Sequence, residues 1–333
     1  MGSLFATDAF NFAALTTAIN ILPNRYGLIQ KMNLMPGRGI PTTKVKIEEY
    51  HGLLKLLPTT PKGSPGLLAA RGKRKVREFT IPHIPYDDVV LPEEAQDNRS
   101  FGYGDKLTST ADLLAQYLQA MRDNHSITLE HLRMGALKGE ILDADGSTIY
   151  DLFTEFNITA KIINFEFSNA TTDVKAICLE LKRHVEDNLS NQIADSITCL
   201  VSPEFYDALT GHPVVKSAYD RWQNGEAQRA DMRDGFPFGG ILWREYRAKA
   251  DTPDGATRRF IAANEGHAFP TGTSYFETYF GPGDFSDTVN QPGIEIYARI
   301  EDRKFRRGAD LHTQSNPLPI CVRPSILVKV TKS

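Results

Sequence analysis

The sequence has few cysteines and no long hydrophobic run. Cys178, Cys199 and Cys321 are the three cysteines among 333 residues, and no two of them form a C-x-x-C pair. The odd count and the spacing favour free thiols in a reducing compartment over a disulfide framework. No apolar stretch approaches the roughly 18–20 residues that a membrane-spanning helix needs. The first 24 residues contain neither Lys nor Arg, so we expect no secretory signal.

The chain also lacks a strong excess of either charge. Lys and Arg number 38 against 41 Asp and Glu, which gives a formal net charge of −3. This balance argues against a nucleic-acid-binding protein that relies on bulk positive charge, although a local basic patch stays possible. Ordinary shares of hydrophobic (41%) and charged (24%) residues exclude a disordered chain, a collagen and a coiled-coil rod.

Catalytic and metal-binding motifs are missing as well. The sequence contains no H-E-x-x-H, no Cys/His cluster at zinc spacing, no G-x-S-x-G and no Walker A loop. DADG at residues 143–146 places its glycine at the fourth position, whereas a calcium loop needs it at the sixth. We interpret these residues as a turn. The sequence therefore predicts no enzyme, no metal and no cofactor.

The N-terminal part predicts an arm and a long hairpin. Residues 1–40 contain one short helix, near 10–22, among prolines and glycines. Period-two alternation predicts strands at 44–48 and 75–81, separated by a cluster of turn-forming residues at 58–66. This hairpin has too few apolar residues for a core of its own, so we expect it to lie on another surface.

The strongest helix prediction covers residues 108–138. Seven residues at helical spacing form its apolar face, and Gly139 suits its C-terminal end. The seven are Leu114, Leu118, Met121, His125, Leu129, Leu132 and Ala136. Ser109 and Asp112 fit a capping box at its start. A hairpin follows at 140–150, and then a second helix that we expect Thr171 or Thr172 to cap.

From residue 197 onward the pattern changes to short strands and helices rich in Gly and Pro, which indicates a separate α/β unit up to about residue 300. A strand at 197–201 precedes Ser202 and Pro203, which start a helix. Residues 320–330 form a strand-like tail in which Ile326, Val328 and Val330 alternate.

A run of positive charge, RGKRKVR at residues 71–77, is the most conspicuous candidate site. We call Arg71, Lys73, Arg74, Lys75 and Arg77 the basic run. Such a run can bind nucleic acid, or it can pair as a basic strand with an acidic surface of this protein or of a neighbour. No aromatic interleaving accompanies it, which favours the second hypothesis. Acidic pairs at 87–88 and 93–94 are candidate partners.

Several separate segments resemble a single protein family. They are TLEHLRMGALKGEILDADGSTIYDLFTEF at 128–156, PTTPKGSPG at 58–66, the basic run followed by Phe79 and IPHIP at 81–85, FGGILWREY at 238–246, DTVN at 287–290 and QSNPLPICVRP at 314–324. Together they resemble the "type E" major capsid proteins of tailed bacteriophages, typified by lambda. QDNRS at 96–100 is more polar than the family pattern.

The resemblance implies an α+β fold, the tailed-phage major capsid fold, with four parts. These are an N-terminal arm (1–40), an extended loop hairpin (41–82), a peripheral domain with a long spine helix (83–195 and 311–333) and an axial domain (196–310). In this fold the extended loop lies over a neighbouring subunit, away from packaged DNA. The resemblance therefore implies intersubunit contacts for the basic run.

The implied function is structural. Copies of the chain would self-assemble as hexamers and pentamers into an icosahedral shell, with packaged double-stranded DNA on its inner face. Implied partners are a scaffolding protein, a maturation protease, a portal and a decoration protein, with no membrane. The implied location is the virion capsid, after assembly in the host cytoplasm. Two alternatives remain, a DNA-binding protein that uses the basic run and an enzyme with a dispersed site in residues 196–310.

Overall fold

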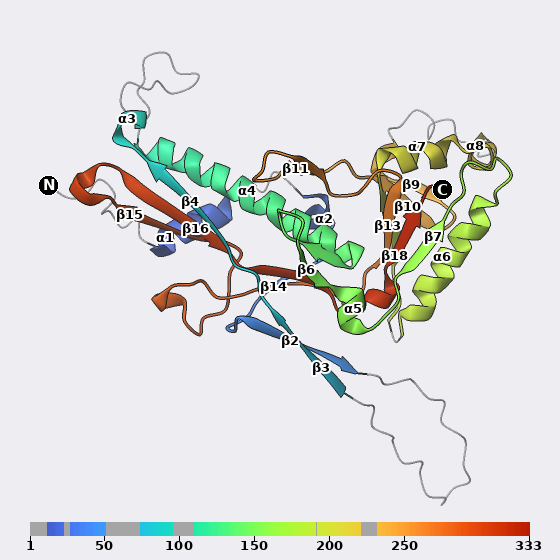
Figure 1. Ribbon diagram of the computed structural model, residues 1–333, viewed down its shortest axis with the longest axis horizontal. Helices are drawn as coiled ribbons and strands as arrows, with labels where there is room; N and C mark the ends of the chain where they lie inside the picture. The colour runs from blue at the N-terminus through green and yellow to red at the C-terminus, as the bar shows by residue number, and fades with distance from the viewer. Residues whose placement is uncertain (1–11, 23–26, 51–73, 96–109, 191, 221–231) are drawn as a thin grey trace, which may run out of the picture. The chain divides into compact units, whose positions relative to one another are not determined.

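The structure is a computed structural model that describes residues 12–22, 27–50, 74–95, 110–190, 192–220 and 232–333 (Figure 1). The chain divides into two compact units, and each is assembled from three stretches. Unit 1 comprises Met1–Val45, Phe79–Arg133 and Glu277–Ile320, and unit 2 comprises Lys46–Glu78, Met134–Phe276 and Cys321–Ser333. None of the helices in the described ranges combines the length and apolar character that crossing a bilayer takes.

Unit 1 contains two three-stranded sheets and most of the longest helix. One sheet has the order β15-β16-β4 and is antiparallel, and the other has the order β1-β14-β17. The strands are β1 (Gly37–Gly39), β4 (Ile84–Val90), β14 (Phe276–Phe280), β15 (Tyr297–Asp302), β16 (Ala309–Ser315) and β17 (Pro317–Cys321). The helices are α1 (Phe12–Ile21), α2 (Leu28–Lys31), α3 (Pro92–Ala95) and α4 (Thr110–Lys138), of which the last passes into unit 2 after Arg133.

The core of unit 1 lies where α1 and α4 pack on the β15-β16-β4 sheet. Its members are buried apolar side chains from all five elements and the residue just before β15, namely Leu15, Ile19, Val90, Leu113, Leu114, Leu118, Met121, Ile296, Ala298 and Leu311. Two polar side chains of α1 fix that helix on β15. The Thr16 hydroxyl accepts from the amide of Ala298 at 3.2 Å, and the Asn20 amide donates to the carbonyl of Ile296 at 2.8 Å.

Helix α4 confirms the prediction for residues 108–138. All seven residues of the expected apolar face are buried, and Met121 and Ala136 are fully so. Gly139 ends the helix with φ of 81°, a left-handed conformation that glycine adopts without steric cost. The proposed capping box lies outside the described residues, because Ser109 and the side chain of Asp112 are not among them.

Unit 2 is built on a mixed six-stranded sheet of order β7-β18-β13-β8-β10-β9. Its strands are β7 (Lys161–Asn164), β8 (Ser196–Val201), β9 (Phe236–Phe238), β10 (Ile241–Glu245), β13 (Glu265–Thr271) and β18 (Val328–Thr331). Two pairings are parallel, β7 with β18 and β8 with β10. The helices of this unit are α5 (Leu152–Phe156), α6 (Val174–Asn188), α7 (Pro203–Gly211) and α8 (Pro213–Asp220).

Aromatic side chains form the centre of unit 2. Phe165 meets both Phe205 and Trp243 edge-on, with ring centroids 5.4 Å apart in each pair, and Phe205 stacks on Trp243 at 5.8 Å. All three rings are fully buried. Phe205 reaches this position because Ser202 caps α7, its hydroxyl accepting from the amide of Phe205, and Pro203 occupies the first turn, as the sequence predicted.

Two sequence expectations are wrong in detail. Helix α6 is capped by Asp173, whose carboxylate accepts from the amide of Ala176 at 3.1 Å, and not by Thr171 or Thr172. The two threonine hydroxyls instead donate to oxygens of Asn169 and Glu166. The tail is also no continuous strand, because a 3₁₀ turn, η5 (Pro324–Ile326), separates β17 from β18. Pro324 has no N–H to donate to a strand pairing.

Three two-stranded hairpins complete the described fold. β5 (Glu140–Leu142) pairs with β6 (Thr148–Asp151) around the predicted turn, in which Gly146 has φ of 92°. β11 (Lys249–Asp251) pairs with β12 (Thr257–Arg259). β2 (Lys44–Tyr50) and β3 (Arg74–Thr80) lie side by side (Figure 1), which confirms both predicted strands of the long hairpin. The turn-forming residues between them lie outside the described residues.

The contact units group the chain differently from the four-part division expected from the sequence. β15, within 196–310, pairs with β16, which pairs with β4. β18, within 311–333, pairs with β13 and β7. The four parts name roles within a shell, which a division by contacts does not test, and they stay a proposal.

Replacing Phe205 by Ala should destabilise unit 2 strongly. The change removes a ring that is fully buried against two others, and large aromatic deletions of this kind cost about 3–5 kcal/mol. Urea unfolding of the unassembled subunit measures the loss. Leu179→Ala, at a position that is 38% exposed on α6, is the matched control and should cost far less. Equal effects would contradict this description of the core.

Candidate assembly surface

Strand β3 carries the described part of the basic run. Strand alternation places Lys75 and Arg77 on one face, as expected. Lys75 is exposed and Arg77 is half-buried. Arg71 and Lys73 lie outside the described residues, and of Arg74 the structure describes only its place in the strand.

Arg77 contacts its own chain at the C-terminal end of α5. Its Nε donates to the carbonyl of Glu155 at 2.9 Å, and its Nη2 donates to that of Phe156 at 3.4 Å. The guanidinium carbon lies 4.5 Å from the centroid of the Phe156 ring. The last carbonyls of a helix have no partner within the helix, and an arginine at this end satisfies them while it complements the helix dipole.

This arrangement anchors strand β3 on α5. Asn157 ends α5 in the left-handed conformation, with φ of 55°, and its amide bonds back to the carbonyl of Thr154 at 3.0 Å. The sequence prediction assigned all five residues of the basic run to contacts between subunits. Arg77 has an additional role that sequence reasoning missed, because α5 is distant in the sequence and its exposed carbonyls leave no residue signature.

A basic groove of about 320 Å³ lies beside this anchor. It is lined by residues of β3, of the end of α5 and of the turn that follows β17. They are Lys75, Arg77, Phe156, Asn157, Ile158, Val322, Arg323, Pro324 and Ser325. Three of these residues are cations and none is a carboxylate. Arg323, which the sequence analysis did not single out, donates to the carbonyl of Asn188 and lies 5.9 Å from the ring centroid of Tyr275. The groove is therefore suited to an anionic segment.

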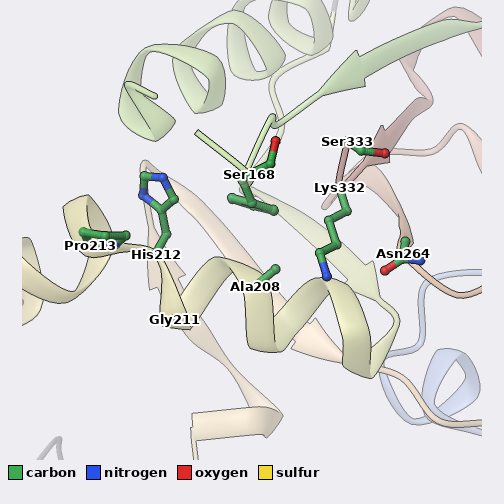
Figure 2. Close-up of a pocket in the computed structure, with 9 residues that line it drawn as sticks. Ser168, Ala208, Gly211, His212, Pro213, Asn264, Lys332 and Ser333 are labelled. Atoms are coloured by element: carbon green, nitrogen blue, oxygen red, sulfur yellow. The ribbon is translucent and has the colours of Figure 1, made fainter. Parts of the chain in front are cut away.

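A second hollow, of about 500 Å³, lies beside α7 and the start of α8 (Figure 2). Figure 2 shows the Lys332 side chain extending toward the helix that carries Ala208. Its serine and histidine do not form a nucleophile pair. The His212 ring is hydrogen-bonded through Nε2 to the carbonyl of Asn169 at 3.1 Å, and nothing in the described part of the chain connects it to Ser168. The arrangement offers no activated nucleophile there.

The cysteines are free and buried in the core. Burial raises the pKa of Cys178 and of Cys321 to about 12, and it raises the pKa of Cys199 as well. The reactive form of a cysteine is the thiolate, so these thiols are inert packing groups. Within the described ranges, no group of three or more His, Cys, Asp or Glu side chains is placed to hold a metal ion.

Two buried histidines are held in their neutral form. His125 on α4 lies 3.0 Å from the hydroxyl of Thr313, and burial, reinforced by Arg122 and His312, lowers its pKa from 6.5 to about 4. Burial, together with Lys138 and Lys329, lowers the pKa of His267 to about 3. Both rings belong to the packing of their units, and neither is poised near neutral pH for proton transfer.

The sequence profile described as "Phage major capsid protein E" matches residues 11–332. The chain belongs to this family. Curated major capsid proteins of Salmonella phage Felix O1 and Pseudomonas phage KPP10 are each 28% identical to it, with 96% of both chains covered in each case. The mature capsid of bacteriophage PhiM1 contains a chain of similar fold, with a TM-score of 0.55 at 12% identity over 94% of this chain and 89% of that one.

As a phage major capsid protein E, the chain is a structural protein of the virion, and many copies of it assemble into the capsid. The family assignment confirms the expected resemblance and the capsid fold. It supports neither the DNA-binding alternative nor the enzyme alternative. The basic groove and the β2–β3 hairpin are thus features of a protein whose activity is assembly.

Acidification should destabilise the unassembled subunit through its buried histidines. The folded pKa of His125, about 4, lies below the ordinary 6.5, so the unfolded chain binds more protons between these values. Stability is therefore present above pH 6.5 and declines as the pH falls toward 4, with a slope of up to about 1.4 kcal/mol per pH unit for this histidine. The measurement is the melting temperature at pH 7 and at pH 5.

His125→Gln keeps a donor for Thr313 but does not titrate, so its melting temperature should fall less over this interval than that of the parent protein. His83→Gln, at an exposed position, controls for the general effect of acid on the carboxylates. An unchanged pH dependence in the His125 variant would contradict the assignment.

Proposed function

We propose that this capsid protein forms hexamers and pentamers that close into an icosahedral shell around double-stranded DNA. Family membership over residues 11–332 is the observation that carries the proposal. In this proposal a scaffolding protein guides assembly, a portal occupies one vertex, a maturation protease acts on the assembled shell, and a decoration protein binds the outer surface. The four parts keep their roles as N-terminal arm (1–40), extended loop (41–82), peripheral domain (83–195 and 311–333) and axial domain (196–310).

The extended loop is proposed to lie on a neighbouring subunit. Within the described chain the buried positions of the β2–β3 hairpin are few, namely Val45, Ile47 and Phe79. Val76 is 54% exposed and Lys75 is exposed as well. A strand pair with so little apolar cover gains stability from a partner surface.

The basic run is proposed to serve this contact, and the basic groove supports a division of labour within it. Arg77 anchors β3 on α5 of the same chain. Lys75 lines the groove without a partner in the described part of the chain. Lys75, with the other residues of the run, is then the part that meets an acidic stretch of a neighbour. Exposed ion pairs are worth only about 0–1 kcal/mol each, but a shell repeats each pair in every subunit.

The proposal is tested by assembly of the purified protein, alone or with its scaffolding protein. The expected products are capsomers, tubes or shells, observed by sedimentation and negative-stain electron microscopy. A clean monomer or dimer at high concentration, under every salt and scaffold condition, would contradict the proposal.

Lys73→Glu combined with Lys75→Glu should reduce shell yield while leaving a folded subunit. Neither change disturbs the Arg77 anchor, so circular dichroism should show native helix content. Lys175→Glu combined with Lys249→Glu, at two exposed positions in unit 2, is the matched control and should assemble normally. Normal shells with reduced DNA retention in the Lys73 and Lys75 variant would instead assign the run to the DNA side.

A further inference from the structure

The connection between β15 and β16 presents a second basic cluster at the surface. Arg303, Lys304, Arg306 and Arg307 flank Phe305 there, and we call these five residues the basic tip. Phe305 is 90% exposed. Its φ of 61° and ψ of 15° lie in the left-handed region, which a bulky side chain rarely occupies. The fold therefore holds a large apolar side chain in water and in an unfavourable backbone conformation.

The basic tip is fixed to the end of its sheet. The amide of Arg303 donates to the carbonyl of Gly308 at 3.0 Å, and its Nε lies 2.7 Å from a carboxylate oxygen of Asp310. Gly308 has φ of 112°, and a Cβ at this position would lie 2.4 Å from the carbonyl oxygen of Val90. This close approach, which only glycine permits, joins the tip to the end of β4. Phe305 is thus displayed by a defined turn.

Carboxylates gather at the same end of the sheet. β4 carries Asp87 and Asp88, and α3 follows it with Glu93 and Glu94; we call these four residues the acidic corner. The register pairs Ala309 with Val90, so the connection that follows β4 and the turn that precedes β16 leave the sheet at one edge (Figure 1). Unit 1 thus places four basic residues next to four acidic ones.

We propose that the basic tip of one subunit docks on the acidic corner of a second copy of this chain, with Phe305 as the apolar contact. The inference rests on the proposed function, since it names one of the contacts through which copies assemble. Within the described residues no ion pair joins Lys304 or Arg307 to Glu93, and all three are exposed. The charges of the two features, four against four, are complementary. Because each copy carries both features at one edge, each copy donates a tip and accepts another, which is a heterologous contact that closes into a ring.

DNA is the less suitable occupant of the basic tip. A phosphate backbone would gain from the four cations, and Phe305 could stack on a base. It would also meet the four carboxylates of the corner at the same edge, where like charges repel. A protein surface that carries the inverse arrangement satisfies both features at once.

Reversal of charge and its restoration test the contact. Lys304→Glu with Arg307→Glu should weaken each contact about tenfold, which corresponds to about 1.4 kcal/mol, and shell yield should fall accordingly. Asp87→Lys with Glu93→Lys should have the same effect. The chain that carries all four changes restores complementarity with inverted sign, and its shell yield should return toward that of the parent protein. Lys175→Glu with Lys249→Glu is the control of equal charge.

Phe305→Gly separates docking from folding. Glycine relieves the left-handed backbone, so the melting temperature of the subunit should stay the same or rise. Shell yield should nevertheless fall, because the apolar contact is lost. A purely structural role for Phe305 predicts no loss of assembly.

The outcomes distinguish this inference from the function on which it rests. If the parent protein never assembles, the proposed function fails. If the parent assembles and the Lys304 and Arg307 variant gives the same shell yield, only the docking inference is overturned. Normal shells with reduced DNA retention would overturn it in favour of a nucleic-acid contact. Loss in both charge-reversed variants, followed by restoration in the combined one, supports it.

Discussion

Burial of one face of α4 is the constraint on which unit 1 depends. Leu114, Leu118 and Met121 pack there against α1 and the β15-β16-β4 sheet. Each large apolar side chain removed from water contributes about 1.5–3 kcal/mol, so this face outweighs any surface ion pair in the unit. The polar bonds follow from this packing, because Thr16 and Asn20 can reach the backbone around β15 only once α1 is seated.

A second constraint is the anchoring of the β2–β3 hairpin. Its few buried side chains cannot hold it alone, and Arg77 supplies two hydrogen bonds to carbonyls that α5 cannot satisfy internally. An arginine suits this position because its guanidinium reaches two adjacent carbonyls while its plane covers the Phe156 ring. The charge nearest to α5 is consequently used for folding, and Lys75, two residues earlier, remains at the surface.

Local patterns predicted local structure well. The helical spacing of apolar residues identified the whole buried face of α4, and alternation identified β2 and β3. What failed depended on competition between neighbours or on distant contacts. Three candidate caps stand in a row before α6, and Asp173 prevails because its carboxylate lies three residues before the amide of Ala176. The tail pattern of Ile326, Val328 and Val330 suited a strand, but Pro324 interrupts the pairing.

The surface features show the same limit more sharply. The basic run was evident because five cations occur within seven residues, yet its role for Arg77 depends on α5, nearly eighty residues away. The basic tip has a comparable signal in the sequence, four cations around one Phe, but only the strand register places it beside the acidic corner. Composition thus reveals where charge gathers, whereas the fold decides which opposite charge it faces.

The division between bonded and displayed charge suits a protein that assembles in many copies. Glu130 accepts from the amide of Ile29, and Arg133 donates to the side chain of Gln30, so these buried charges are used within unit 1. Lys75, Lys304 and Glu93 remain exposed. Contacts made by exposed charges are individually weak and therefore reversible. A misplaced subunit can then dissociate before its neighbours lock it in place, while simultaneous engagement of many such contacts holds a completed shell.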